Sequence, residues 1–273
     1  PELLYQTDDT YGPVGAEVNE DNSLFYYAGG NSSEVILYDI NSGVASYVPG
    51  TDSGSERHDF EIDGDIVYYT SDADLYAGNM TDGSTSILVD DGIYGDVIAG
   101  ITLDRTNGVL YYVAQFNDWG IGKVNTDGTG IEYDFINTPG EIRGITIDEV
   151  SQIIYFVQHT TGDVYSVPAD GSEEPTLLYA VSGLNPGGYG YHIDLDTDGM
   201  LYWVKFDGND DDMVLRAPAN NVLPPSPFTF SVSQSSFDCS NAGENTIEIT
   251  AEDAYGNISV ASFIVTVLDS DAP

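Results

Sequence analysis

Three aspartates and a glycine stand close together in the segment HIDLDTDG, residues 192–199. Asp194, Asp196 and Asp198 alternate along the chain and Gly199 follows them, the spacing of an oxygen-rich calcium loop. The twelfth position of such a loop calls for glutamate but holds Lys205, and the ninth, where some propeller loops carry aspartate, holds Tyr202. Asp194, Asp196 and Asp198, together with the acidic run that contains Asp210, are therefore the candidate calcium ligands, although neither loop pattern is complete.

Other carboxylates come in pairs that could perform acid and base catalysis of the glycosidase type. They lie on or just after segments predicted to be innermost strands: Glu61, Asp63, Asp104, Asp148, Asp194 and Asp196. Four of them, at 63, 104, 148 and 196, recur at the same place in a repeat. A recurring aspartate at a hairpin is typical of a turn in which the carboxylate caps backbone amides. We therefore expect no catalytic residues and no enzymatic activity.

The histidines and the cysteine give no further chemistry. His58, His159 and His192 form no H-x-H or H-E-x-x-H motif, so structural roles are favoured over a metal site. The single cysteine, Cys239, excludes an internal disulfide and a cysteine-based metal site. There is no phosphate-binding glycine loop and no nucleophile elbow.

Charge restricts the partners. The 273 residues include 46 acidic and six basic ones, a formal net charge of −40. Such a polyanion is repelled by nucleic acid and by anionic lipid, and no apolar run reaches the roughly 18 residues of a membrane span. Three N-x-[ST] sequons, at Asn31, Asn79 and Asn257, are candidate glycosylation sites. Together these features favour a secreted, extracellular or cell-surface protein.

A repeat organises most of the chain. Aromatic pairs in the segments LFYY, IVYY, VLYY, IIYF and LYWV recur every 42 to 47 residues, ending at Tyr27, Tyr69, Tyr112, Phe156 and Trp203. An alternating segment precedes each pair, and a further strand-like segment and a turn follow it. This pattern predicts four short antiparallel strands per copy, which is the blade of a β-propeller.

The fifth copy lacks a fourth strand of its own. PELLY at residues 1–5 matches PTLLY at 175–179, the outer strand of the fourth copy, in four of five positions. We therefore predict a five-bladed propeller over residues 1–221, closed by a strand at residues 2–7, because an open ring would leave unpaired sheet edges. A six-membered ring completed outside this chain is the alternative.

The copies GITLDRTNGVLYYV and HIDLDTDGMLYWV resemble the YWTD repeats of low-density-lipoprotein-receptor propellers over residues 14–221, although only Tyr202 and Trp203 match the first half of the tetrad. The resemblance implies an extracellular interaction scaffold. No ligand motif of that family is matched.

A proline-rich linker at residues 222–227 leads to a second part, residues 228–273, that alternates as strands. Its motifs FDCS, T-x-x-I-T-A-x-D and V-T-V-x-D resemble the second half of HYR-type immunoglobulin-like modules. Three strands fall short of the about seven in a complete sandwich. We therefore expect the part either to pack on the propeller or to accept a strand from another chain.

The function predicted from these features is an extracellular structural or adhesive one. The chain would be a subunit or segment of a surface assembly or filament, joined by strand complementation to other copies of itself or to surface proteins. The alternative is a carbohydrate-binding propeller with aromatic platforms at Tyr94, Trp119 and Tyr189. A glycosidase or lyase comes third.

Overall fold

The structure is a computed structural model. It describes residues 13–18, 24–29, 35–51, 59–71, 73–90, 98–115, 119–181, 189–206, 213–220, 228–234, 236–253 and 258–268. The chain forms two compact units, Pro1–Arg216 and Ala217–Pro273, which are described separately. The predicted linker, residues 222–227, and the predicted closing strand, residues 2–7, lie outside the described residues.

The first unit consists of antiparallel sheets whose strands follow one another in sequence order. The first sheet consists of β1 (Pro13–Val18), β2 (Leu24–Gly29), β3 (Val35–Asp39) and β4 (Val44–Tyr47), and the second of β5 (Phe60–Asp63), β6 (Ile66–Ser71), β7 (Asp74–Asn79) and β8 (Thr85–Val89). The third sheet consists of β9 (Ile98–Asp104), β10 (Val109–Gln115), β11 (Trp119–Asn125) and β12 (Glu132–Asn137). The fourth consists of β13 (Ile142–Asp148), β14 (Ile153–Gln158), β15 (Val164–Pro168) and β16 (Thr176–Tyr179). The fifth has three strands, β17 (Tyr189–Leu195), β18 (Met200–Phe206) and β19 (Met213–Pro218).

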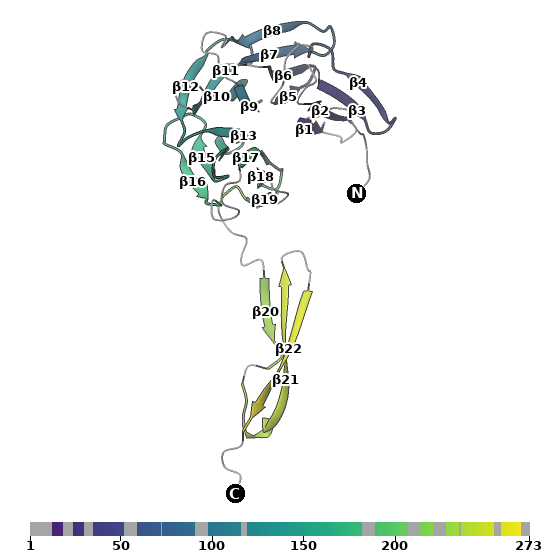
Figure 1. Cartoon of the computed structure of the whole chain (residues 1–273), viewed down its shortest axis with the longest axis vertical. Coiled ribbons are helices and arrows are strands. Elements are labelled where there is room, and N and C mark those ends of the chain that lie inside the picture. The colour runs from purple at the N-terminus through teal and green to yellow at the C-terminus, as the bar shows by residue number, and fades with distance from the viewer. Residues whose placement is uncertain are drawn as a thin grey trace. The chain divides into compact units, whose positions relative to one another are not determined.

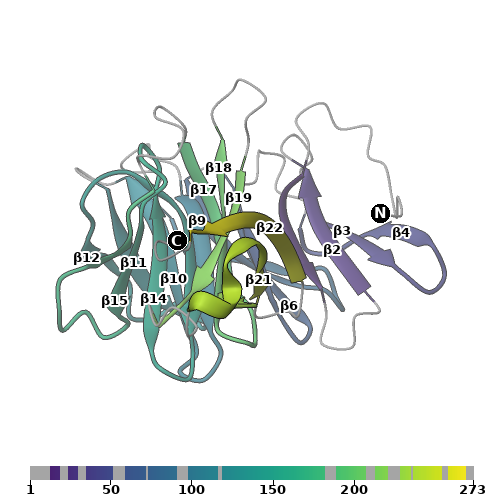
Figure 2. The same cartoon turned by 90° about the horizontal axis from the view of Figure 1, so that it is seen from below.

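These sheets are arranged about a common centre, as expected for propeller blades (Figure 1). The first strand of each sheet is the innermost, and successive innermost strands are in contact: β1 with β5, β5 with β9, β9 with β13 and β13 with β17. Figure 2 shows the strands of each sheet running side by side when the view is turned by 90°. The prediction of an all-β propeller is confirmed, while closure of the ring by residues 2–7 stays a prediction.

The apolar core lies between the sheets. Three clusters of buried side chains each join two successive sheets, the first with the second, the second with the third and the third with the fourth. The recurring aromatics supply much of this core, because Tyr69, Tyr112 and Phe156 are almost fully buried. Their large side chains fill the space between neighbouring blades, which explains why the aromatic pair marks the repeat in the sequence.

The innermost strands share a β-bulge that the repeat did not predict. The register with the second strand shifts by one residue in β1, β9, β13 and β17. In β13 the extra residue is Arg143, and in β17 the shift lies between Gly190 and Ile193. A bulge bends a strand and changes the direction of its side chains, and in β9 the extra residue, Ala99, packs in the apolar core.

The second unit is a three-stranded antiparallel sheet in the order β20 (Phe228–Val232), β21 (Gly243–Asp253) and β22 (Ile258–Val267), with a short 3₁₀ turn at Cys239–Asn241. Among its described residues no second layer covers this sheet. The structure thus contains one sheet here and does not show an immunoglobulin-like sandwich.

Candidate functional site

A cavity of about 680 Å³ lies at the centre of the first unit, a volume within the range of small-molecule sites. Its walls come from the innermost strands β5, β9, β13 and β17 and from the hairpins that follow them. The ionisable residues that line it are Asp59, Glu61, Arg105, Glu149, His192 and Asp194. Four carboxylates, one guanidinium and one imidazole therefore share a single open space.

One repeat position supplies two of these residues. In each copy the buried aromatic of the second strand pairs with a residue of the first strand, and the position in question immediately precedes that residue. In the second to fifth copies this position holds Asp59, Gly100, Gly144 and His192. Glycine is required at the middle two. A Cβ on Gly100 would lie 2.5 Å from the carbonyl oxygen of Arg143, and one on Gly144 would lie 2.7 Å from the backbone nitrogen of Ile193.

Asp59 and His192 therefore replace a glycine that elsewhere lets neighbouring backbones touch. Their side chains line the cavity instead. A role for Asp59 was not predicted from the sequence, although a signal was present. Two copies of the repeat have another residue where the packing of the blades requires glycine in the third and fourth copies, and these two residues place a side chain in the cavity.

The carboxylate of Asp59 joins two blades. Its Oδ1 accepts a hydrogen bond from the backbone N–H of Phe60, and its Oδ2 accepts one from that of Ile101 on the next innermost strand, both at 3.0 Å. Burial raises the pKa of Asp59 to about 6, with the nearby Asp194 acting in the same direction, while His192 and the two amides oppose the rise. A carboxyl group with this pKa can release or take up a proton near neutral pH.

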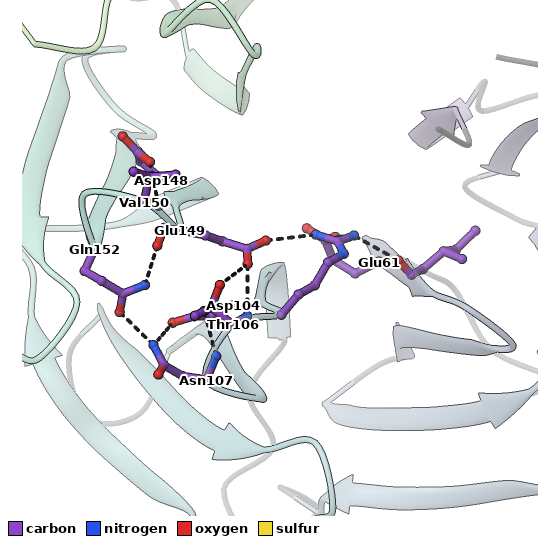
Figure 3. A network of polar contacts seen from close by, with 10 residues as sticks. Glu61, Asp104, Thr106, Asn107, Asp148, Glu149, Val150 and Gln152 are labelled. Atoms are coloured by element: carbon purple, nitrogen blue, oxygen red, sulfur yellow. Dashed lines mark hydrogen bonds and ion pairs between the residues drawn. The ribbon is translucent and has the colours of Figure 1, made fainter. Parts of the chain in front are cut away.

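Arg105 lies between Glu61 and Glu149, two cavity-lining carboxylates that are labelled in Figure 3. One guanidinium nitrogen donates to Glu61 Oε2 at 3.2 Å and to the carbonyl oxygen of Ile62 at 2.8 Å, while the other lies 3.5 Å from Glu149 Oε1. Glu149 also accepts from the backbone N–H of Thr106 at 3.0 Å. These partly exposed ion pairs link side chains of three successive blades, and they contribute little to stability.

Three of the four recurring aspartates, Asp104, Asp148 and Asp196, accept hydrogen bonds from backbone amides of their own hairpins. Oδ1 of Asp104 accepts from the backbone N–H of Asn107, and Oδ1 of Asp148 accepts from those of Val150 and Ser151 (Figure 3). Asp196 caps its hairpin in the same way. Hydrogen bonds to these amides and to Ser151 lower the pKa of Asp148 although partial burial opposes the shift.

The predicted calcium residues do not form one site in the described part of the chain. Oδ1 of Asp196 accepts from the backbone N–H groups of Asp198 and Met200 at 2.9 and 2.8 Å, so it is committed to the turn. Asp194 accepts from the N–H of Leu195 at 2.7 Å and lines the cavity, and Asp198 is exposed. Asp210 lies outside the described residues, and no cluster of three or more His, Cys, Asp or Glu side chains suited to a metal occurs among those described.

The other predicted sites are placed unevenly. Asn79 ends β7, and its Oδ1 accepts from the backbone N–H groups of Thr81 and Asp82, so this sequon is folded into a tight turn. Asn31, Asn257, Tyr94 and His58 lie outside the described residues, and Trp119 is described only as part of β11. Tyr189 is 45% exposed at the start of β17. In the described part of the chain no helix is long and apolar enough to cross a membrane.

The sheet of the second unit is a candidate interaction surface. Its edge strand β22 pairs with β21 over ten consecutive residues without a register shift. Apolar side chains remain accessible on both faces, with Val232 46% and Phe263 44% exposed on one and Val260 55% and Ile264 63% exposed on the other. The described residues thus leave a long apolar edge strand with one side unpaired.

Comparison with known proteins defines the class of fold. No protein-family model matches the chain, and no curated protein matches it. Among solved structures it is similar to a chain of a nidogen–laminin complex, with a TM-score of 0.64 at 15% identity, covering 76% of each chain. It is also similar to a luciferin-regenerating enzyme, with a TM-score of 0.62 at 12% identity, covering 95% of this chain and 92% of that one.

A third similar structure is regucalcin, a calcium-binding protein of Agrobacterium tumefaciens, with a TM-score of 0.60 at 12% identity, covering 95% of this chain and 76% of that one. These neighbours establish the β-propeller fold. They also correct the expectation that the chain is not an enzyme. Because an enzyme shares this fold over nearly the whole chain, neither the all-β scaffold nor the structural role of the turn aspartates is a reason to exclude catalysis.

Proposed function

We propose that the chain is a structural or adhesive component of an extracellular surface assembly, in which the sheet of its second unit accepts a β-strand along the outer edge of β22. The observation that carries this proposal is the composition of that edge. The ten residues of β22 include no charged residue and no proline, and their pairing with β21 contains no bulge. Natural sheets usually protect exposed edges with one of these devices.

The packing of the unit supports the same function. A single layer of three strands leaves Val232 and Phe263 nearly half exposed, which costs the unit the stabilisation that burial of these side chains would provide. An incoming strand would form backbone hydrogen bonds along the free edge of β22 and so extend the sheet. The apolar side chains of that strand would then pack against the apolar side chains of the sheet. The HYR-type resemblance of this part fits an incomplete module finished by a partner, and the YWTD-like blades fit an extracellular scaffold.

Variants that place a charge on the edge test this proposal. Val260→Lys combined with Ile264→Lys adds two cations to an otherwise uncharged strand at side chains that are already exposed, so the fold is expected to persist. We expect the wild-type protein to form assemblies in sedimentation velocity and negative-stain electron microscopy at 0.5 M NaCl, and the double variant to stay monomeric.

A matched control is Val150→Lys, because Val150 is 96% exposed in a hairpin of the first unit. This variant should assemble like the wild type. Wild-type protein that is monomeric across protein and salt concentrations, both alone and with surface extract from its source, would show that β22 does not accept a strand. Assembly that survives the double substitution would show that the joining surface lies elsewhere.

A further inference from the structure

A cluster of aromatic and charged side chains lies at the start of the innermost strands β13 and β17. We call it the His159 patch, and it consists of Tyr189, Tyr191, His159, Glu141 and Arg143. The tyrosines flank Gly190 on β17, the charged pair flanks Ile142 on β13, and the histidine follows β14. Neither the core nor the cavity lining includes the two tyrosines.

The rings of the patch are held in a fixed arrangement. The ring of His159 stacks on that of Tyr189 at a centroid distance of 4.8 Å and 24°, and meets that of Tyr191 edge-on at 5.0 Å and 83°. Its Nδ1 lies 3.0 Å from the carbonyl oxygen of Gly190. Backbone hydrogen bonds from His159 N to Glu141 O and from Gly190 N to His159 O tie the three segments together. A ligand would therefore meet preorganised rings.

The β-bulge in β17 contributes to this arrangement. The register with β18 shifts between Gly190 and Ile193, which includes Tyr191 and His192. At the bulge, the segment of β17 that contains both residues lies opposite a segment of β18 that is one residue shorter. Consequently Tyr191 contacts His159 while His192 lines the central cavity.

The two tyrosines keep a substantial accessible surface. Tyr189 is 45% and Tyr191 is 37% exposed, whereas the recurring aromatics Tyr69, Tyr112 and Phe156 are almost completely buried. Exposed aromatic rings that are locked by neighbouring groups cost little conformational entropy on binding. Each ring provides an apolar face with a hydroxyl group at its edge, and the two ring planes are steeply inclined to each other because they lie at 24° and 83° to that of His159.

The charges beside the rings balance each other. Oε1 of Glu141 lies 2.9 Å from Nε and 2.6 Å from a terminal nitrogen of Arg143, so one carboxylate oxygen receives two guanidinium N–H groups. An anionic ligand is repelled by the overall charge of −40. A cation gains little from a carboxylate that is already neutralised. The surroundings therefore favour an uncharged ligand that has both an apolar face and hydroxyl groups.

We propose that the His159 patch binds a neutral saccharide. The C–H face of a pyranose ring would stack on one of the two tyrosine rings while the other ring contacts the edge of the sugar, and its hydroxyl groups would hydrogen-bond to Glu141 and Arg143 at the rim. This binding is independent of strand acceptance at β22, and it would attach an assembled protein to glycans of a surface or matrix.

Affinity electrophoresis in gels that contain laminarin, xylan or galactomannan tests the proposal, with anionic alginate as the comparison. We expect wild-type protein to be retarded by at least one of the neutral polysaccharides and not by alginate. Loss of a stacked aromatic ring typically weakens binding roughly tenfold. Tyr189→Ala and Tyr191→Ala should each reduce the apparent association constant by about that factor, and Tyr189→Phe should retain most of it.

The matched control is Tyr47→Ala, because Tyr47 is 65% exposed on β4, in a different blade. Near-ultraviolet circular dichroism and thermal unfolding establish that each variant is folded. Retardation that persists in both folded alanine variants, or the lack of retardation by all three neutral polysaccharides, overturns the proposal. The Val260→Lys and Ile264→Lys variant separates the two functions, since it should lose assembly and keep saccharide binding.

Discussion

Asp59 joins two innermost strands through both oxygens of its carboxylate, and it does so inside a cavity shared with three other carboxylates. Its acidic form is favoured by burial, which raises its pKa, while its hydrogen bonds favour the ionised form. Together with His192 and Asp194 it provides a proton donor and proton acceptors in one space. This is the chemical capacity that the turn aspartates, each committed to its own hairpin, do not have.

The raised pKa of Asp59 predicts a pH dependence of stability. Because the pKa rises from 3.8 to about 6 on folding, the folded protein holds this proton more tightly than the unfolded chain. The associated stabilisation is complete below pH 3.8 and is lost as the pH rises through about 6. Asp59→Asn removes this proton equilibrium, so the stability of the variant relative to the wild type should increase between pH 4 and pH 7, by at most about 3 kcal/mol.

Urea unfolding of both proteins at several pH values measures this effect. Asp127→Asn is the control, because hydrogen bonds from Thr129 lower the pKa of Asp127 from 3.8. Its stability relative to the wild type should therefore change only below about pH 4, and with the opposite sign, and should stay constant between pH 4 and pH 7. A stability difference between wild type and Asp59→Asn that does not change with pH would contradict the prediction.

At the scale of the elements, the innermost strands depend on close backbone contact. Gly144 on β13 lies against the backbone of His192 and Ile193 on β17. Neither of these neighbours is the end of a flexible side chain, so the strands themselves must separate to admit a methyl group. The same close contact defines the spacing of the blades and thus the dimensions of the central cavity.

Gly144→Ala should therefore destabilise the first unit by roughly 1–3 kcal/mol or more, the usual cost of overpacking. Differential scanning calorimetry measures the loss. Gly120→Ala is a matched control in β11, since a Cβ there meets only the carbonyl oxygen of Ile136, at 3.2 Å, and a smaller effect is expected. Equal destabilisation by the two variants would show that the contact between β13 and β17 has no special weight.

At the scale of the whole molecule, the large negative net charge opposes assembly. The net charge is −40, and Ala217–Pro273 carries seven carboxylates and no basic residue. Two such units that exchange a strand repel each other in dilute salt. Cations reduce this repulsion, because the screening length falls from about 30 Å at 0.01 M to about 3 Å at 1 M ionic strength.

We therefore expect both the melting temperature and the assembled fraction to rise between 0.01 and 1 M NaCl, measured by calorimetry and sedimentation velocity. A specific calcium site would behave differently, since micromolar to millimolar CaCl₂ would raise the melting temperature where equal MgCl₂ does not. A melting temperature and an assembled fraction that are both independent of NaCl would contradict the role assigned to charge.

The sequence by itself determined the class of fold and the local role of several residues. Aromatic pairs at a fixed period predict blades because each blade must bury the same large side chains against the next, and aspartates at hairpin ends predict caps because they bond amides only two to four residues away. Both are local or repeated features, so they are visible along the chain. The strands of the second part were predictable for the same reason.

Only the tertiary structure decided which distant residues share a site. Asp59 and His192 are more than a hundred residues apart and meet because the ring brings β5 and β17 to one cavity. The His159 patch depends on the approach of three segments that are far apart in the sequence, which leaves no periodic signal. Packing across the ring decides which strands come close to one another. A single sequence indicates such a contact only where a residue departs from the repeat, as Asp59 and His192 do.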